Sequence, residues 1–127
     1  MIKISCIFCA LSENRVKLEN EYAIAIYDKY PVNEGHMLII SRRHFKNYFE
    51  ATEEEVVALN NLLKEAREYL DTNYNPEGYN IGVNINEAAG QTIMHLHIHL
   101  IPRYKGDIDD PRGGVRKLKK ELVPYEG

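Results

Sequence analysis

The sequence lacks any long apolar run, and none of its hydrophobic stretches approaches the roughly 20 residues that a membrane-spanning helix needs. It also lacks a basic excess: 16 Lys and Arg stand against 19 Asp and Glu, which argues against a dedicated nucleic-acid-binding protein. Cysteine is scarce, with two residues, and these follow the first residues too closely to leave room for a signal-peptide core. We therefore expect a cytoplasmic protein with reduced thiols, which binds neither membranes nor nucleic acid.

A length of 127 residues suits one domain with one core. After Pro102 the sequence becomes rich in glycine, proline and charge, so we divide it into a domain over residues 1–104 and a C-terminal tail over residues 105–127. The tail carries three lysines near its end, Lys117, Lys119 and Lys120. It is either a solvated tail or an arm that contributes to the functional site or to a partner subunit.

Hydrophobic periodicity predicts an α+β fold. We expect strands over residues 16–19, 22–27, 36–41, 79–86 and 94–102. A helix is expected over residues 52–70, where Thr52 and Glu55 form a capping box and an apolar stripe recurs at helical spacing. This helix should cover one face of the sheet. Strict alternation in the fourth strand predicts that four residues face the core: Tyr79, Ile81, Val83 and Ile85.

The most unusual segment is the last expected strand. Three histidines, His95, His97 and His99, alternate there with Leu96, Ile98 and Leu100. Side chains on a strand alternate between its two faces, so the histidines should form a row on one face and the apolar residues should pack on the other. A row of imidazoles needs polar partners when it is buried. We therefore interpret this segment as the active-site strand.

Three interpretations of the histidine row remain open. A catalytic metal bound by all three is hindered by strand geometry, because residues i and i+4 stand roughly 13 Å apart. Alternatively, a neutral imidazole attacks phosphorus while its neighbours move protons, and the small-residue loop over residues 87–92 contacts phosphate oxygens. In the third interpretation the histidines are purely structural.

Cys6 and Cys9 form a C-x-x-C motif with three possible interpretations. They could be half of a structural zinc site, which needs two further ligands such as the histidines downstream. They could be a redox pair, although the surrounding sequence lacks a thioredoxin-like βαβ pattern. They could also be two ordinary reduced cysteines.

The segment His95–Ile101 resembles the signature of the histidine triad (HIT) family, in which three histidines alternate with apolar residues. Further segments resemble family landmarks in the family order: Cys6–Cys9, Gly35–Ile40, Arg43-His44, Ala89–Thr92 and Pro102-Arg103. The resemblance extends over about residues 5 to 104. It implies that residues 1–104 form a nucleotide-binding HIT domain, with an antiparallel sheet of about five strands and one long helix. It also implies a homodimer with a continuous sheet.

The resemblance further implies a role for individual residues. Family members release a nucleoside monophosphate through a covalent nucleotidyl-histidine, and His97 matches the nucleophile by position. His99 and His36 match histidines that contact the phosphate and support the nucleophile. Asp28 matches the residue that holds the ribose hydroxyls. The remaining matches, to residues that bind the phosphate and the leaving group, are Asn84, Gln91 and Thr92.

Many family members also carry a structural zinc ion, whose ligands here would be Cys6, Cys9, His44 and His95, and no catalytic metal is then required. The transferase branch has glutamine in place of the third histidine, so His99 favours hydrolysis. The tail is similar to that of bacterial and archaeal members thought to act on dinucleoside polyphosphates. We therefore expect hydrolysis of a phosphoanhydride or a phosphoramidate at the α-phosphorus of a purine nucleotide, with dinucleoside polyphosphates or AMP adducts as substrates. A nucleotide-binding regulatory or scaffold protein and a zinc-dependent hydrolase are the alternatives.

Overall fold

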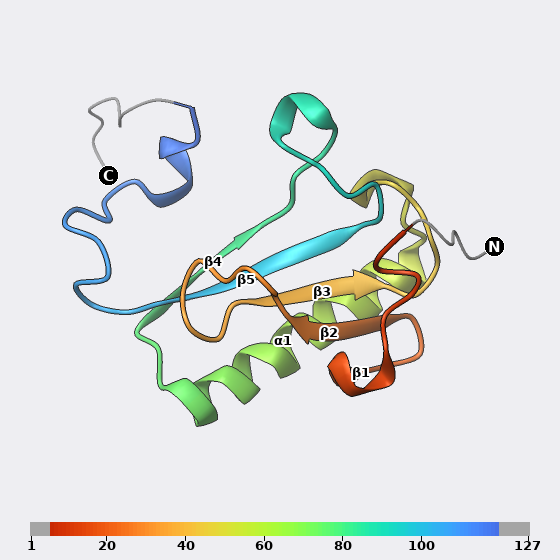
Figure 1. Cartoon of the computed structure of the whole chain (residues 1–127), viewed down its shortest axis with the longest axis horizontal. Helices are drawn as coiled ribbons and strands as arrows, with labels where there is room; N and C mark the ends of the chain where they lie inside the picture. Colours follow the sequence, from red (N-terminus) through yellow and green to blue (C-terminus); the bar gives the residue numbers. More distant parts are fainter. Residues whose placement is uncertain (1–5, 120–127) are drawn as a thin grey trace.

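The structure, a computed structural model, describes residues 6–119. Five strands form one antiparallel sheet in the order β1-β2-β3-β5-β4 (Figure 1). Their bounds are Val16–Glu19 (β1), Ala23–Tyr27 (β2), Met37–Ser41 (β3), Gly78–Gly82 (β4) and His97–Arg103 (β5). One long helix, α1 (Glu53–Tyr74), lies across one face of the sheet (Figure 1). The predicted α+β fold, a five-stranded antiparallel sheet with one long helix, is therefore confirmed.

Helix α1 begins as its sequence predicts. The Thr52 hydroxyl accepts from the Glu55 amide, and the Glu55 carboxylate accepts from the Thr52 amide, which completes the capping box. Arg43 donates two hydrogen bonds to the same carboxylate, and this guanidinium holds the pKa of Glu55 below its usual range. The helix extends four residues beyond the predicted end at Leu70 and stops at Asn75, which adopts a left-handed conformation.

The sheet is buried on both faces. On one side α1 packs against β2, β3 and β5, and the buried residues there include Leu96, Ile98 and Leu100. On the other side Phe8 from the N-terminal segment packs against β2 and β3. The apolar residues of the histidine strand therefore face the helix, as predicted, and the histidines lie on the face opposite α1. The ladder begins later than expected, at His97, so His95 lies two residues before β5.

The prediction for the fourth strand was partly wrong. Strand β4 ends at Gly82, and Ile81 is 51% exposed although the alternation placed it in the core. Ile81 pairs with the buried Leu100 and so faces the helix side of the sheet. Helix α1 makes most of its sheet contacts with β2 and β3. It meets β4 at Tyr79, whose hydroxyl donates to the Asp71 carboxylate, and leaves the Ile81 side chain exposed. The alternation therefore predicted correctly the face of the sheet on which Ile81 lies, whereas the position of β4 at the sheet edge explains why its side chain is exposed.

The described part of the tail returns along β4 (Figure 1). Tyr104 donates to the Glu34 carbonyl, and Asp107 accepts from Arg103 and Asn33. These contacts hold the segment against the ends of β4 and β5. Residues 1–5 of the predicted domain and residues 120–127 of the predicted tail, including Lys120, lie outside the described residues. Within the described part of the chain, no helix is both long and apolar enough to cross a membrane.

Candidate active site

A cleft of about 740 Å³ opens on the sheet face opposite α1. Its lining includes Gly90 and the polar residues Asp28, Asn84, Thr92, His97 and His99. Its apolar lining includes Ile7, Phe8, Leu11, Ile26, Leu38 and Ile93. The cleft therefore combines an apolar wall with a small set of convergent polar groups, which is typical of a small-molecule site.

The central histidine of the row has a fixed proton position. Nδ1 of His97 lies 2.8 Å from the main-chain oxygen of His95. A carbonyl oxygen can only accept, so in the neutral ring Nδ1 carries the proton and Nε2 carries the lone pair. The ring is flanked by Phe8 at 5.0 Å and His99 at 5.2 Å between centroids. His97 is half-buried and lines the cleft, so it can act there as a nucleophile or a base.

His36 and His99 form a hydrogen-bonded relay beside it. The Val32 amide donates to Nδ1 of His36 at 3.0 Å, which leaves the His36 proton on Nε2. That nitrogen lies 3.0 Å from Nδ1 of His99 and donates to it. The neutral ring of His99 must then carry its own proton on Nε2. The strand thus offers a lone pair at His97 and an N–H donor at His99.

The electrostatics support neutral rings at both relay positions. Burial lowers the pKa of His36, and the nearby Asp28 carboxylate offsets part of that shift. Burial lowers the pKa of His99 to about 4, with smaller contributions from the charges of His97 and His36. The Asp28 carboxylate lies 3.4 Å from Nε2 of His36, and its other oxygen accepts from the Tyr30 amide.

Asp28, His36 and His99 also lie close enough together to hold a metal ion. The donor set does not fit one. A metal on Nε2 of His36 would move the proton to Nδ1, where it would face the N–H of Val32. Two donors cannot share that contact, so these residues fit a hydrogen-bonded relay better than a metal centre.

The other predicted binding residues separate into two groups. Asn84 and Thr92 are exposed and line the cleft, as expected of residues that contact a ligand. Gln91 is buried and does not line it. Its side chain donates to the carbonyls of Lys46 and Ile93 and accepts from the Asn86 amide. These bonds hold the loop that carries Thr92 and the short 3-10 helix η3 (Glu87–Ala89).

Sequence reasoning missed several cleft residues, notably the cations Arg15 and Lys29 and the ring of Phe8. Arg15 donates to the Tyr27 carbonyl, next to Asp28. Among the described residues, no carboxylate lies within ion-pair distance of Arg15. Lys29 could have been predicted to line the cleft, because it follows Asp28 directly in the sequence. Nothing in the sequence placed Arg15 or Phe8 against the histidine strand.

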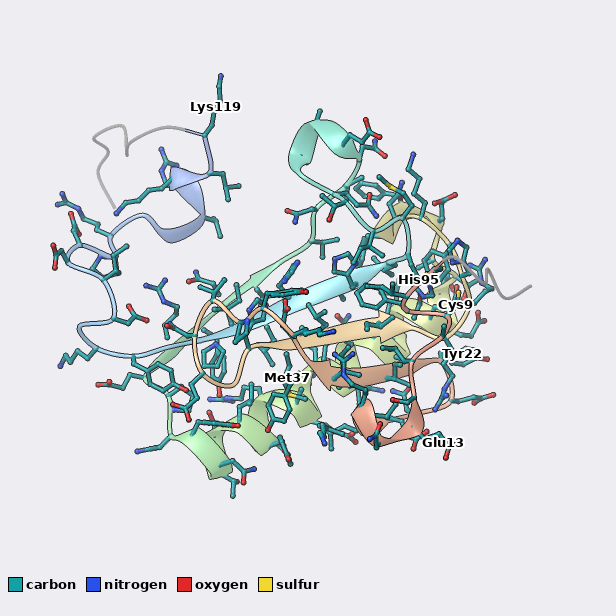
Figure 2. The ribbon with its side chains drawn as sticks, in the orientation of Figure 1. Cys9, Glu13, Tyr22, Met37, His95 and Lys119 are labelled. Atoms are coloured by element: carbon teal, nitrogen blue, oxygen red, sulfur yellow. The ribbon has the colours of Figure 1, made fainter. Side chains whose placement is uncertain are left out.

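Cys6, Cys9, His44 and His95 form a second cluster, whose four donor atoms lie within 4.8 Å of one another. Figure 2 shows Cys9 and His95 side by side, close to the N-terminal segment of the chain. Nε2 of His95 donates to the Ser41 carbonyl at 2.7 Å, so its Nδ1 lone pair is directed into the cluster.

The distances within this cluster fit a tetrahedral metal ion. Nδ1 of His95 lies 3.3 Å from the Cys6 sulfur, 3.5 Å from the Cys9 sulfur and 3.1 Å from Nδ1 of His44. Tetrahedral zinc bonded to sulfur and nitrogen would hold such atoms roughly 3.3–3.6 Å apart, which matches the two sulfur–nitrogen distances and is slightly longer than the nitrogen–nitrogen distance. The cluster could therefore bind a metal ion, and the structure brings together all four ligands that the family resemblance implied.

Several known proteins are similar to this chain in sequence. An uncharacterized HIT-like protein of Mycoplasma pneumoniae is 38% identical over 83% of this chain and 76% of its own length. The bis(5'-adenosyl)-triphosphatase of Dictyostelium discoideum is 26% identical over 90% of this chain and 76% of its own. The AP-4-A phosphorylase of Mycobacterium tuberculosis is 29% identical over 75% of this chain, which spans about half (49%) of that protein.

Solved structures match as well. A hypothetical histidine triad nucleotide-binding protein of Sulfolobus tokodaii aligns with a TM-score of 0.73 and 38% identity, over 80% of this chain and 71% of its own. A Zn-bound histidine triad family protein of Mycobacterium smegmatis aligns with a TM-score of 0.73 and 30% identity, over 82% and 78% of the two chains. The HIT domain family model matches residues 11–106. The chain therefore belongs to the HIT domain family, the histidine triad proteins that its sequence resembles.

Proposed function

We propose that this protein is a nucleotide hydrolase that cleaves at the α-phosphorus and releases a nucleoside monophosphate. The observation that carries the proposal is the 2.8 Å contact between Nδ1 of His97 and the His95 carbonyl. This contact leaves the Nε2 lone pair of a neutral imidazole available within the cleft. Family membership and a relative named as a bis(5'-adenosyl)-triphosphatase support the same chemistry.

The reaction has two steps. Nε2 of His97 attacks the α-phosphorus and a P–N bond forms. The bond from phosphorus to the leaving group, P–O in a dinucleoside polyphosphate or P–N in a phosphoramidate, breaks, and the leaving group takes the electron pair and a proton from solvent water. Water then attacks phosphorus and gives up one proton to the solvent, the P–N bond to His97 breaks with its electron pair returning to Nε2, and the nucleoside monophosphate departs. The Nε2–H of His99, kept in place by His36, donates to the phosphate oxygens in both steps.

The remaining cleft residues bind the nucleotide. Asp28 holds the ribose hydroxyls, and the apolar wall contacts the purine. Asn84 and Thr92 hold the phosphate and the leaving group. Gln91, which the resemblance matched to the same role, acts through its hydrogen bonds to the loop rather than through its side chain in the cleft.

The substrates are dinucleoside polyphosphates or AMP adducts. The test is a turnover panel of diadenosine tri- and tetraphosphate, adenosine phosphoramidate and aminoacyl-AMP, with products resolved by mass spectrometry. Rapid acid-free quenching should recover an acid-labile nucleotidyl adduct on His97 in the wild type and none in His97→Ala. A His97→Ala protein with normal turnover would refute the proposal. Tight nucleotide binding without turnover would indicate the alternative, a regulatory or scaffold protein.

The Cys6, Cys9, His44 and His95 cluster holds a structural zinc ion in this proposal. Zinc would supply a cross-link between the N-terminal loop and the start of β5, and none of the reaction steps uses it. A zinc-dependent hydrolase would instead lose all turnover on removal of the metal. The protein also forms a homodimer, in which the exposed edge strand β4 continues the sheet into a second copy.

A further inference from the structure

Phe8 occupies an unusual position between the two cysteines of the C-x-x-C loop. Its ring is buried, 8% exposed, and belongs to the core on the cleft side of the sheet. It meets the ring of His97 at 5.0 Å between centroids and 65° between planes, and the ring of His95 at 5.9 Å and 89°. One aromatic ring therefore contacts both the nucleophile and a member of the cysteine–histidine cluster, edge to face.

We infer that Phe8 is a positioning residue, which transmits the geometry of the cysteine loop to the nucleophile His97. Rotation about the terminal torsion of a histidine is soft, so a hydrogen bond through one nitrogen needs support from neighbouring groups. Among the described residues, the rings in contact with His97 are Phe8 and His99, and His99 lies on the partly exposed cleft side. Phe8 is the buried neighbour, and it limits the rotation that would take Nδ1 away from the His95 carbonyl.

The same loop contacts the residue that carries that carbonyl, whose peptide unit is also held by the hydrogen bond from the Leu96 amide to the Phe45 carbonyl. The sulfur atoms of Cys6 and Cys9 converge on Nδ1 of His95, at 3.3 and 3.5 Å, and the carbonyl of His95 accepts the His97 proton. Of the two groups that orient His97, the Phe8 ring belongs to the cysteine loop and the carbonyl belongs to His95, whose ring that loop contacts. If the ring turns, the Nδ1 bond is lost, and the tautomer with its proton on Nε2 has no lone pair for phosphorus.

The test compares Phe8→Leu with Leu62→Val, a control substitution on the helix side of the sheet, where Leu62 is fully buried. Two-dimensional NMR of ¹⁵N-histidine-labelled protein, at a pH where the imidazoles are neutral, reports the tautomer of His97. The wild type and the control should show the Nδ1–H form. Phe8→Leu should show a mixture, and its kcat should fall roughly 10–100-fold, more than KM changes.

Removal of the metal supplies the second arm. Zinc-loaded and chelator-treated wild type are compared by the same NMR signal, and chelation should shift His97 toward the mixed state seen in Phe8→Leu. A pure Nδ1–H signal in either Phe8→Leu or the chelated protein would overturn the inference. The effect on kcat rests on the proposed function, whereas the tautomer does not. A tautomer change in a protein that hydrolyses no nucleotide would therefore refute the function alone.

Discussion

His36 donates its Nε2 proton to Nδ1 of His99 across 3.0 Å, and this contact determines which nitrogen of His99 carries a proton. The Val32 amide fixes the direction, because its N–H occupies the other ring nitrogen of His36. The Val32 amide therefore determines which nitrogen of the buried His36 carries a proton, and His36 in turn determines this for His99, which lines the cleft. His97 and His99 differ chemically because their Nδ1 atoms meet different partners, a carbonyl oxygen and an N–H donor.

Replacement of His36 tests this relay. His36→Leu removes the donor to His99 and the acceptor of the Val32 amide. We expect kcat to fall about 10²-fold, the lower end of the usual contribution of acid–base groups, and stability to fall by about 1–3 kcal/mol. His36→Gln can keep an amide donor directed toward His99 and should retain more activity. Steady-state kinetics and denaturant unfolding measure both effects, and equal kcat values for the two variants would contradict the relay.

The buried state of His99 predicts a loss of stability in acid. Its folded pKa of about 4 lies below the ordinary value of 6.5, so the unfolded state binds more protons between these two values. The unfolding free energy should therefore be unaffected by His99 above pH 6.5 and fall as pH drops toward 4, by about 3 kcal/mol in all.

Denaturant unfolding at pH 7, 5.5 and 4.5 measures this loss in the wild type and in His99→Gln. Because glutamine does not titrate, the variant should lose less stability over the same interval. The unfolding free energy that the variant still loses is due to other titrating groups. One of these is His36, because burial lowers its pKa as well. Parallel curves for the two proteins would show that His99 titrates normally.

The sequence was informative where a short-range pattern decides the outcome. Alternation alone placed Leu96, Ile98 and Leu100 against the helix and the histidines on the other face. The capping box of Thr52 and Glu55 located the start of α1. In both cases the relevant interactions lie within a few residues, so the periodicity of the chain carries the information.

The sequence did not predict contacts between segments that are far apart in the chain. The Val32 amide, which sets the protonation of His36, and the Phe8 ring, which contacts His97, come from other parts of the chain. Gln91 was assigned to the ligand because its loop matches the family pattern, yet its amide is bonded within the protein. Local sequence shows that a polar side chain is near the site, but only tertiary packing shows which partner it has.

Removal of a bound metal should destabilise the protein. A ligand that binds the folded state alone stabilises it by mass action, and the Cys6, Cys9, His44 and His95 cluster exists only in the fold. We expect about one zinc per chain by elemental analysis and a lower Tm after treatment with a chelator. Cys9→Ser should have the lower Tm from the start and should respond little to the chelator. Identical melting of the wild type with and without chelator would contradict a structural metal site.

The exposed edge of the sheet indicates how two copies would pair in the proposed homodimer. Strand β4 is an edge strand of the described sheet, and Ile81 on it is 51% exposed, although α1 reaches the same strand at Tyr79. An edge strand with unpaired backbone groups and an uncovered apolar side chain favours strand-to-strand association. A charge at this position should oppose association, because it would have to be desolvated on pairing.

Ile81→Lys should therefore shift the protein from dimer to monomer, measured by light scattering after size-exclusion chromatography over a range of concentrations. Val57→Lys is the matched control, because Val57 is similarly exposed, at 58%, but lies on α1. The control should keep the wild-type mass, and both variants should keep the wild-type circular dichroism. A dimer that survives Ile81→Lys and dissociates with Val57→Lys would place the interface on the helix instead of the sheet edge.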